Sequence, residues 1–207
     1  MKRVLIATTN RGKLRDFQGA AARFDIAIAC LPNLDRLPAV TEDGPTFEAN
    51  ARKKAEAYSR YVPGEMVIAD DSGLEVDALG GAPGVHSARY AADTPHLQSG
   101  NATDEGNNAR LLQELKDVPP PRRTGRFVCV IAAARSGKVL QVFRGEAAGL
   151  ILTTPSGHQG FGYDPLFYSP SIRKTFAELS PEEKAAYSHR GAAFRRFLTW
   201  YGNCENQ

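Results

Sequence analysis

Two adjacent aspartates, Asp70 and Asp71, are the residues of this chain best suited to carry out chemistry. They directly follow residues 66–69, an apolar run that is typical of a buried strand. Ligand sites in α/β sheets lie at the carboxyl ends of strands, and Mg²⁺ takes carboxylate oxygens there together with water and substrate phosphates. Adjacent strand residues point to opposite faces, so we expect only one aspartate to face a given site. The alternative is an Asx turn that ends the strand.

A lysine on the packed face of a helix is the second candidate. Residues 47–61 have Ala-rich helical character. At about 100° per residue, one face of this helix collects Phe47, Ala51, Lys54 and Tyr58. Lys53 falls outside that face. Lys54 therefore either reaches an anionic ligand or extends its amine to solvent beside the core. Glu42, just before the helix, is a candidate second carboxylate for a metal.

A polar loop between a short strand (residues 4–7) and a helix (residues 13–24) is a candidate phosphate site. It consists of Thr8, Thr9, Asn10, Arg11, Gly12 and Lys13. A helix N-terminus offers N–H groups and partial positive charge, and a glycine lets the backbone approach an oxyanion. Lys13 adds a full charge. The loop lacks the spacing of a P-loop or a dinucleotide fingerprint, and the alternative is a capped turn with a solvated lysine.

A glycine-rich loop with two aromatic residues could bind a planar base. It contains Gly160, Phe161, Gly162, Tyr163 and Asp164. Flanking glycines let an aromatic ring stand clear for stacking, and a carboxylate can accept hydrogen bonds from a base edge or a ribose. The alternative is that both aromatic rings only anchor the loop to the core.

The last helix begins with an unusual cluster of cations. Ser188 is a plausible N-cap for a helix over residues 190–201. His189 and Arg190 oppose the helix dipole at that end, which suggests a ligand with hydrogen-bond acceptors. Lys184 stands a few residues before them and belongs to the same candidate cluster. The alternative is a solvated surface turn.

These candidates need strands and helices to position them. Strand and helix alternate in the first seventy residues, and two long strands are expected at residues 126–135 and 138–151, joined by the turn Ser136-Gly137. The pattern predicts an α/β fold with a mixed sheet. Residues 80–100 are expected to be mostly loop, and residues 118–124 are the best candidate hinge. We expect one domain over residues 1–207.

Composition narrows the class of protein. A net charge of +3 is too mild to imply a nucleic-acid or membrane partner, and 42% hydrophobic residues are ordinary for a globular chain. Three widely spaced cysteines form no metal-ligand or disulfide pattern, which favours a reducing cytoplasm. The apolar run at the start is too short for a signal peptide, and no stretch is long enough to span a bilayer. We therefore expect a soluble cytoplasmic protein.

Taken together, the motifs resemble the inosine triphosphate pyrophosphatase family, which removes inosine and xanthine triphosphates from the nucleotide pool. The matching stretches occur in the family's order: residues 7–13, 46–50 with Lys54, 69–74, 78–84, 87–90, 160–165, 182–184 and 188–191. They cover nearly the whole chain, and the set is more specific than any single member. Thr9 departs from the pattern, because bacterial relatives often carry glycine there.

The resemblance implies an Mg²⁺-dependent attack of water on the α-phosphorus of a nucleoside triphosphate, with pyrophosphate as the leaving group. It implies a two-lobed α/β fold around a long mixed sheet with flanking helices, an active site in the cleft between the lobes, and a homodimer. Asp71 would accept the proton and contact the metal with Glu42, and Asp70 would support them. The triphosphate would be held by residues 8–13, Lys54 and Ser72, with Lys13 and Lys54 also catalytic. The nucleoside would be held by Phe161, Gly162, Tyr163, Asp164, Lys184, His189 and Arg190.

Two other classes of function remain open from the residues alone. A nucleotide-binding regulator would use Phe161 and Arg190 but would gain nothing from Asp71. A nucleic-acid-binding protein would use the basic stretch at residues 121–126 and would bind in a strongly salt-dependent way. Among enzymes, the alternative is a pyrophosphatase with another nucleotide preference.

Overall fold

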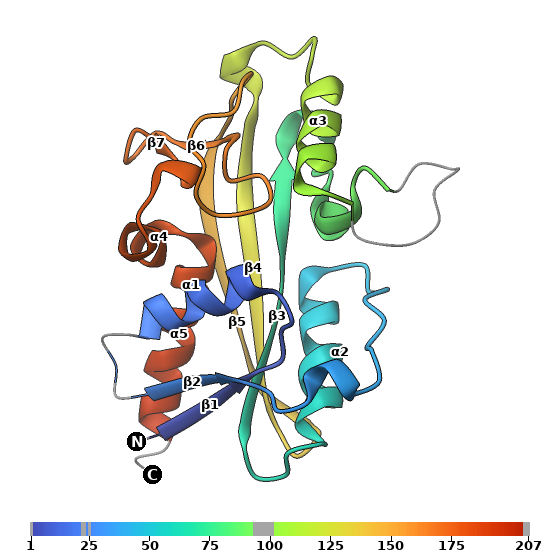
Figure 1. Ribbon diagram of the computed structural model, residues 1–207, viewed down its shortest axis with the longest axis vertical. Helices are drawn as coiled ribbons and strands as arrows, with labels where there is room; N and C mark the ends of the chain where they lie inside the picture. Colours follow the sequence, from blue (N-terminus) through green and yellow to red (C-terminus); the bar gives the residue numbers. More distant parts are fainter. Residues whose placement is uncertain (1, 22–23, 25, 93–101, 205–207) are drawn as a thin grey trace. The chain divides into compact units, whose positions relative to one another are not determined.

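The computed structural model describes residues 2–21, 24, 26–92 and 102–204. Within them, seven strands form one sheet in the order β2-β1-β3-β4-β5-β6-β7 (Figure 1). β1 is parallel to β2 and to β3, whereas β6 is antiparallel to β5 and to β7. The sheet is therefore mixed and carries flanking helices, as the sequence predicted.

The regular elements follow the chain in this order. The strands are β1 (Lys2–Ile6), β2 (Ile26–Cys30), β3 (Met66–Val76), β4 (Thr124–Arg135), β5 (Lys138–Ile151), β6 (Phe167–Ser169) and β7 (Lys174–Thr175). The α-helices are α1 (Arg11–Ala21), α2 (Phe47–Ser59), α3 (Asp104–Glu114), α4 (Pro181–Tyr187) and α5 (His189–Cys204). Short 3₁₀ turns, named η1 to η5, lie between them.

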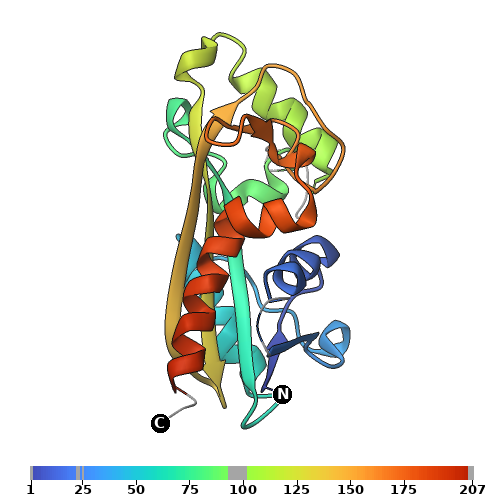
Figure 2. The ribbon, with the colours of Figure 1, turned by 90° about the vertical axis from the view of Figure 1, so that its left-hand side faces the viewer.

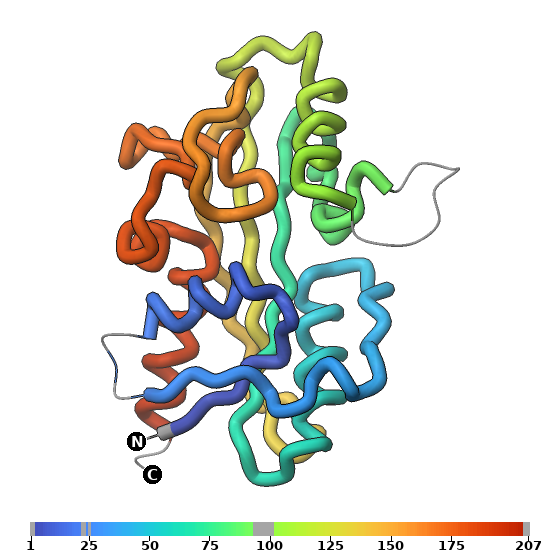
Figure 3. The backbone as a smooth tube through the Cα atoms, in the orientation of Figure 1, coloured from blue at the N-terminus to red at the C-terminus, as the bar shows by residue number. Residues whose placement is uncertain are grey.

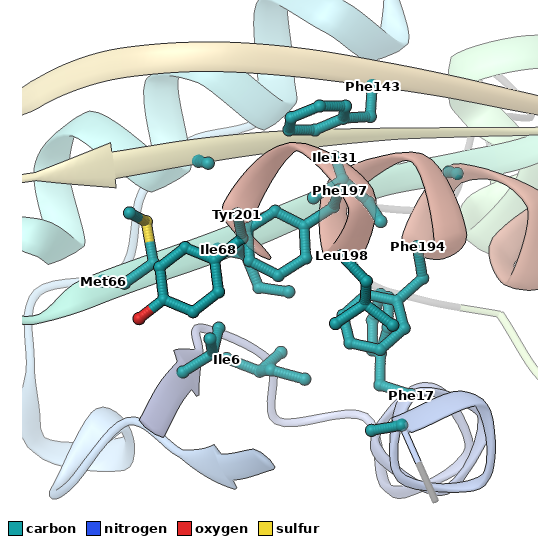
Figure 4. Close-up of a cluster of buried hydrophobic side chains, with 14 of the residues drawn as sticks. Ile6, Phe17, Met66, Ile68, Ile131, Phe143, Phe194, Phe197, Leu198 and Tyr201 are labelled. Carbon is teal, nitrogen blue, oxygen red and sulfur yellow. The ribbon is translucent and has the colours of Figure 1, made fainter. Parts of the chain in front are cut away.

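The chain divides into two compact units, each built from separate stretches of sequence. The first unit comprises Met1–Asp71, Cys129–Glu146 and Pro181–Gln207. Its core forms where α5 runs along the parts of β4 and β5 that belong to this unit (Figure 2). Phe143 and Ile131 lie on one side of α5, and Ile6 and Phe17 lie on the other (Figure 4). The rings of Phe17 and Phe194 meet edge to face, with centroids 5.1 Å apart.

The second unit comprises Ser72–Val128 and Ala147–Ser180. Its core is also apolar and contains Leu111 and Leu115 from α3. Three phenylalanine rings, Phe127, Phe167 and Phe176, pack on one another with centroid distances of 4.5 to 5.6 Å. The candidate hinge at residues 118–124 lies wholly inside this unit, so it does not separate the two units.

Strand β3 differs from the sequence prediction at the two aspartates. The expected strand stopped at Asp70, but β3 continues through Asp70 and Asp71 to Val76. Both carboxylates have cationic or amide partners, described below, so the strand does not need to end in order to solvate them. The β4–β5 turn is as predicted: Ser136 and Gly137 both have positive φ, at 52° and 79°.

Local capping explains where two of the helices begin. The Thr46 hydroxyl accepts the N–H of Ala49 at the start of α2, and the Ser188 hydroxyl accepts the N–H of Gly191, so Ser188 caps α5 as predicted. Residues 31–46, which carry Glu42, connect β2 to α2 as an irregular segment with one 3₁₀ turn, η1 (Leu34–Arg36) (Figure 3). Of the expected loop at residues 80–100, residues 93–100 lie outside the described part of the chain. The rest directly follows η2 (Asp77–Leu79) and contains η3 (Gly84–Arg89). No helix among the described residues is both long and apolar enough to cross a bilayer.

Candidate active site

Lys54 lies between two carboxylates in the first unit. Its ammonium donates to Glu42 Oε2 at 2.7 Å and lies 4.0 Å from Asp71 Oδ1. Lys54 is buried, together with Phe47, Ala51 and Tyr58 on the same face of α2, as the helical spacing predicted. Lys53 is exposed and pairs instead with Asp43. Lys54 is therefore the lysine of α2 that can act on an anion beside Asp71.

The charges of this group shift one another's protonation equilibria. Burial raises the pKa of Asp71, the neighbouring charge of Glu42 raises it further, and Lys54, Lys13 and Asn50 oppose the shift without cancelling it. Burial alone would lower the pKa of Lys54, but the charges of Asp71, Asp70 and Glu42 outweigh that effect and raise it. Lys54 thus stays cationic, while Asp71 is a stronger proton acceptor than an exposed aspartate.

Asn50 binds the oxygen of Asp71 that Lys54 does not approach, and it was not among the residues predicted for the site. Its Nδ2 donates to Asp71 Oδ2 at 2.9 Å, and its Oδ1 accepts the N–H of Gly44 at 2.8 Å. Asn50 is buried, so its bond to Asp71 is shielded from water, and the bond from Gly44 is partly shielded. One amide therefore connects the carboxylate of β3 to the loop that carries Glu42. Its position four residues before Lys54 on α2 was the available signal.

Asp70 has a different set of partners from Asp71, as expected for neighbours in a strand. Its Oδ2 lies 3.0 Å from Lys13 Nζ and 3.7 Å from Arg190 Nε. Burial would raise the pKa of Asp70, but the charges of Lys13, Arg190 and Lys54 hold it well below its usual range. Asp70 is therefore ionised and anchors two cations.

The loop before α1 uses part of its polar character to start that helix. Asn10 Oδ1 accepts the N–H of Lys13 at 3.0 Å, and Thr8 Oγ1 accepts the N–H of Asn10 at 3.2 Å. Thr9, Asn10 and Arg11 are exposed, whereas Gly12 is buried. The capped turn of the alternative interpretation is thus present, but its lysine is not a solvated one, because Lys13 pairs with the buried Asp70.

Two cations, Arg190 at the start of α5 and Lys184 of α4, are buried and face an aspartate of α1. Arg190 Nη1 donates to Asp16 Oδ2 at 2.6 Å, and Lys184 Nζ lies 3.9 Å from the same oxygen. Burial would lower the pKa of Arg190, but Asp70 and Asp16 raise it. Burial, Arg190 and Lys184 lower the pKa of His189 well below its usual range, so this imidazole is neutral at pH 7. A solvated surface turn is therefore excluded.

Asp16 is a second residue that sequence reasoning missed. It lies one turn after Lys13 on α1, and only the folded structure brings it to Arg190, 174 residues later. A single aspartate in a helix surrounded by other charges gives no signal of that contact in the sequence.

The glycine-rich loop belongs to the second unit and is tightly organised. Asp164 is buried, and its Oδ2 accepts the N–H of Phe161 at 2.9 Å. The hydroxyl of Tyr163, also buried, donates to the carbonyl of Ser87 at 2.8 Å. Phe161 and Gly162 are only half-buried. Tyr163 therefore anchors the loop, as its alternative interpretation held, whereas Phe161 is only partly buried. Ser72, the first residue of this unit, directly follows Asp71 on β3.

The structure thus brings together two subsets of the predicted site within the first unit. One contains Glu42, Lys54 and Asp71, and the other contains Lys13, Lys184 and Arg190 around Asp16 and Asp70. Among the described residues, no group of three or more histidine, cysteine, aspartate or glutamate side chains gathers as a metal site. Glu42 and Asp71 supply two carboxylates around a shared cation, which is the donor set that Mg²⁺ commonly takes from a protein.

Comparisons with known proteins agree on one family. The Ham1 family profile matches residues 4–200. A dITP/XTP pyrophosphatase of Acidobacterium capsulatum is 51% identical over 194 residues, which cover 93% of this chain and 95% of the relative. The solved structure of the Staphylococcus aureus Ham1 protein has a TM-score of 0.81 at 40% identity and covers 98% of this chain and 99% of its own. A HAM1 protein from Coxiella burnetii gives 0.82 at 36% identity, with 98% and 100% coverage.

Proposed function

The chain belongs to the Ham1 family, and from this premise we propose that it hydrolyses the noncanonical purine nucleoside triphosphates ITP, dITP and XTP to the monophosphate and pyrophosphate. The observation that carries the proposal is the group formed by Glu42, Lys54 and Asp71. It combines a buried base with a raised pKa, a cation and a second carboxylate. A protein that only bound a nucleotide would have no use for such a base.

Asp71 is the proton acceptor in the proposed reaction. It takes a proton from a water molecule as the water oxygen bonds to the α-phosphorus, and the bond from that phosphorus to the bridging oxygen of the β-phosphate breaks. Pyrophosphate leaves with the electron pair of the broken bond, and Asp71 then releases its proton to solvent. The hydrogen bond from Asn50 leaves Asp71 Oδ1, on the Lys54 side, as the oxygen directed at the cationic part of the site.

Glu42 and Asp71 would hold Mg²⁺. Two observations support this fit. The two carboxylates repel each other, which contributes to the raised pKa of Asp71, and a divalent ion would relieve that repulsion. Both carboxylates also already lie next to one cation, the ammonium group of Lys54. When bound, the ion would make an attached water more acidic and neutralise charge on the phosphates. Phosphoryl transfer depends mainly on such positioning and charge neutralisation.

Two lysines and a helix start supply the remaining positive charge for the triphosphate. Lys54 is held at Glu42 and Lys13 at Asp70, so both ammonium groups have fixed positions before substrate arrives. The N-terminus of α1, with the loop from Thr8 to Gly12, adds N–H groups and the positive end of a helix dipole. Ser72, which follows Asp71 on β3, would also contact the triphosphate.

Base selection would depend on hydrogen-bond donors and on stacking. Hypoxanthine and xanthine present an acceptor at O6 where adenine presents an amino donor, so a cationic donor such as Lys184 or Arg190 favours a 6-keto purine. His189 is neutral and buried beside them. Phe161 would stack on the base, and Asp164 would order the loop around it.

Three wider properties are part of the same proposal. We propose that the whole chain, with its two compact units, works as one pyrophosphatase domain, that it forms a homodimer, and that it acts in the cytoplasm on the free nucleotide pool. Nucleic acid and membranes are not proposed as partners, in line with the mild net charge of +3.

Pyrophosphate release from ITP, XTP, dITP, GTP and ATP, each measured with Mg²⁺ and with chelator, tests the proposal. We expect metal-dependent release that favours ITP, dITP and XTP. Asp71→Asn should abolish release while the protein stays folded, because the amide cannot accept the proton and a metal ligand is lost. Absence of release from all five nucleotides, or near-normal turnover in Asp71→Asn, would refute the proposed activity or the assigned base, respectively.

A further inference from the structure

Helix α3 holds both backbone polar groups of Gly162. The Gly162 N–H donates to Asp104 Oδ2 at 2.6 Å, and its carbonyl accepts from Asn108 Nδ2 at 2.9 Å. Asp104 and Asn108 are four residues apart, so they lie on the same face of α3, one turn from each other. These contacts bridge 58 and 54 positions in sequence and lie within the second unit.

Phe161, the residue before Gly162, has its own backbone N–H held as well. This N–H is accepted by Asp164 at 2.9 Å, and the N–H of the following residue is the one that Asp104 accepts. Gly160 and Gly162 have positive φ, at 78° and 63°, and a Cβ on Gly160 would come within 2.1 Å of Asp164 Oδ2. The backbone on either side of Phe161 is therefore fixed in a conformation that favours glycine. This fixes the point from which the Phe161 ring projects.

Helix α3 is itself firmly anchored within its unit. Thr103 caps its first turn by accepting the Gly106 N–H at 3.1 Å, and Leu111 is completely buried in the core. Asn107, between the two clamping residues, accepts the Ala91 N–H at 2.8 Å and is buried. A helix fixed at its cap, its apolar face and its middle can serve as a rigid support for a loop.

We propose that Asp104 and Asn108 are positioning residues for nucleobase binding, which act by holding Phe161 in its stacking position before the ligand arrives. The inference rests on the proposed function, in that the ring of Phe161 must be the one that meets the base. A clamp of this kind increases affinity by reducing the ordering required on binding. It does not touch the phosphates, so it should act on binding more than on the chemical step.

The test compares Asp104→Ala and Asn108→Ala with Glu105→Ala, a matched control that removes an exposed acidic residue from the same first turn of α3. For ITP, we expect each clamp variant to raise KM about 3- to 10-fold, as for a lost hydrogen bond to a charged or amide group, with kcat changed less than about 2-fold. Glu105→Ala should match the wild type. Asp104→Asn keeps an acceptor oxygen and should restore most of the affinity.

Binding measured without turnover separates this inference from the proposed activity. The dissociation constant of ITP is measured by calorimetry in the presence of chelator, so that binding is observed without turnover. In the clamp variants this constant should rise by the same factor as KM. Wild-type protein that binds ITP but releases no pyrophosphate would refute the activity and leave this inference to be decided by the dissociation constants alone.

A double-mutant cycle with Phe161→Ala identifies the route of the effect. If the clamp acts through the ring, Asp104→Ala and Asn108→Ala should add no further loss of ITP affinity in the Phe161→Ala background. The inference is overturned if the clamp variants bind ITP as tightly as the wild type, if their losses add fully to that of Phe161→Ala, if Phe161→Ala itself has no effect, or if wild-type protein fails to bind ITP.

Discussion

Lys53 and Lys54 are neighbours in sequence with opposite surroundings. Lys54 is buried and reaches Glu42 and Asp71, whereas Lys53 is exposed and pairs with Asp43. Removing a cation from a shielded site costs far more than removing one from solvent, because the remaining carboxylates are left unbalanced. The loss of activity on removing Lys54, compared with the loss on removing Lys53, therefore measures how much the site depends on the buried face of α2.

We expect Lys54→Ala to lower kcat/KM for ITP by about 100-fold or more, and Lys53→Ala to change it by less than about 2-fold. Steady-state pyrophosphate release from both variants, compared at equal folded concentration, is the measurement. Equal losses in the two variants would contradict the assignment of Lys54 to the site.

His189 gives the protein a specific sensitivity to acid. Its pKa in the folded protein is well below 6.5 because of burial and the nearby charges of Arg190 and Lys184. The unfolded chain therefore binds a proton more readily than the folded protein as the pH falls through about 6.5, so stability is lost with acidification. Above that pH both states are neutral at this residue and the effect vanishes.

Between pH 7.5 and pH 5.0, the free energy of unfolding should fall by about 2 kcal/mol more in the wild type than in His189→Gln. This is the loss expected when a histidine stays neutral in the folded protein down to pH 5 but is protonated in the unfolded chain. Urea denaturation at both pH values measures this difference. If His189→Gln loses as much stability as the wild type, His189 is not the group responsible.

The residues of the site that the sequence revealed are those whose signal is local. Helical spacing alone separated Lys54 from Lys53. The apolar run before them singled out Asp70 and Asp71 as a pair, and the choice of Asp71 came from the family resemblance. Asn50, Asp16, Asp104 and Asn108 were not found, because each is an ordinary polar residue in a helix until tertiary contacts give it a partner. Such partners lie up to 174 positions away and leave no periodic pattern.

At the scale of elements, α5 packs against β5 more closely than a side chain would allow. A Cβ added at Gly145 would lie 2.2 Å from the carbonyl oxygen of His189 and 2.4 Å from the Ala193 nitrogen. These are backbone atoms of a helix and cannot move aside singly. The two elements must therefore separate if residue 145 carries a methyl group.

Gly145→Ala should accordingly lower the free energy of unfolding by about 1–3 kcal/mol, the usual cost of overpacking. Gly202→Ala is the matched control. Gly202 lies in α5, and a Cβ added there has no neighbour within 4 Å. That change should be neutral or stabilising by up to about 1 kcal/mol, because alanine favours a helix. Thermal unfolding followed by circular dichroism compares the two, and equal melting temperatures would show that the α5–β5 contact is loose.

Elements with a local signature were predictable, and their exact lengths were not. The Ser136-Gly137 turn was recognised from its residues. The end of β3 was predicted too early, because the acidic pair has the composition of a turn. The strand continues because Lys13, Lys54 and Asn50 provide partners for the two carboxylates. Helix α4 was not predicted, since seven residues are too few to show a clear helical period.

At the scale of the whole molecule, no pattern in the sequence marks where one compact unit ends and the other begins. Strands β3, β4 and β5 each pass from one unit to the other, with boundaries after Asp71, Val128 and Glu146. A boundary inside a regular strand has no change of composition, whereas the Pro-rich residues 118–124 look like a linker and lie within one unit. Composition detects flexible linkers, and here the units are divided within strands.

Binding of Mg²⁺ should be visible as a change in the stability of the whole molecule. Glu42 and Asp71 are carboxylates whose repulsion the folded protein must bear, and a divalent ion between them would relieve it. An ion that binds only the folded state at ten times its dissociation constant adds about 1.4 kcal/mol, or ~3–5 °C in melting temperature for a chain of this size. Chelator should reverse the increase, and no nucleotide is needed to observe it.

Three variants make this measurement specific to the proposed ligands. Asp71→Asn and Glu42→Gln should each lose most of the Mg²⁺-dependent increase in melting temperature, whatever their stability without metal. Asp43→Asn is the matched control, since Asp43 is an exposed neighbour that pairs with Lys53 and should leave the increase intact. If all three variants respond to Mg²⁺ as the wild type does, the ion binds elsewhere, and the role of Asp71 would be reduced to proton acceptance.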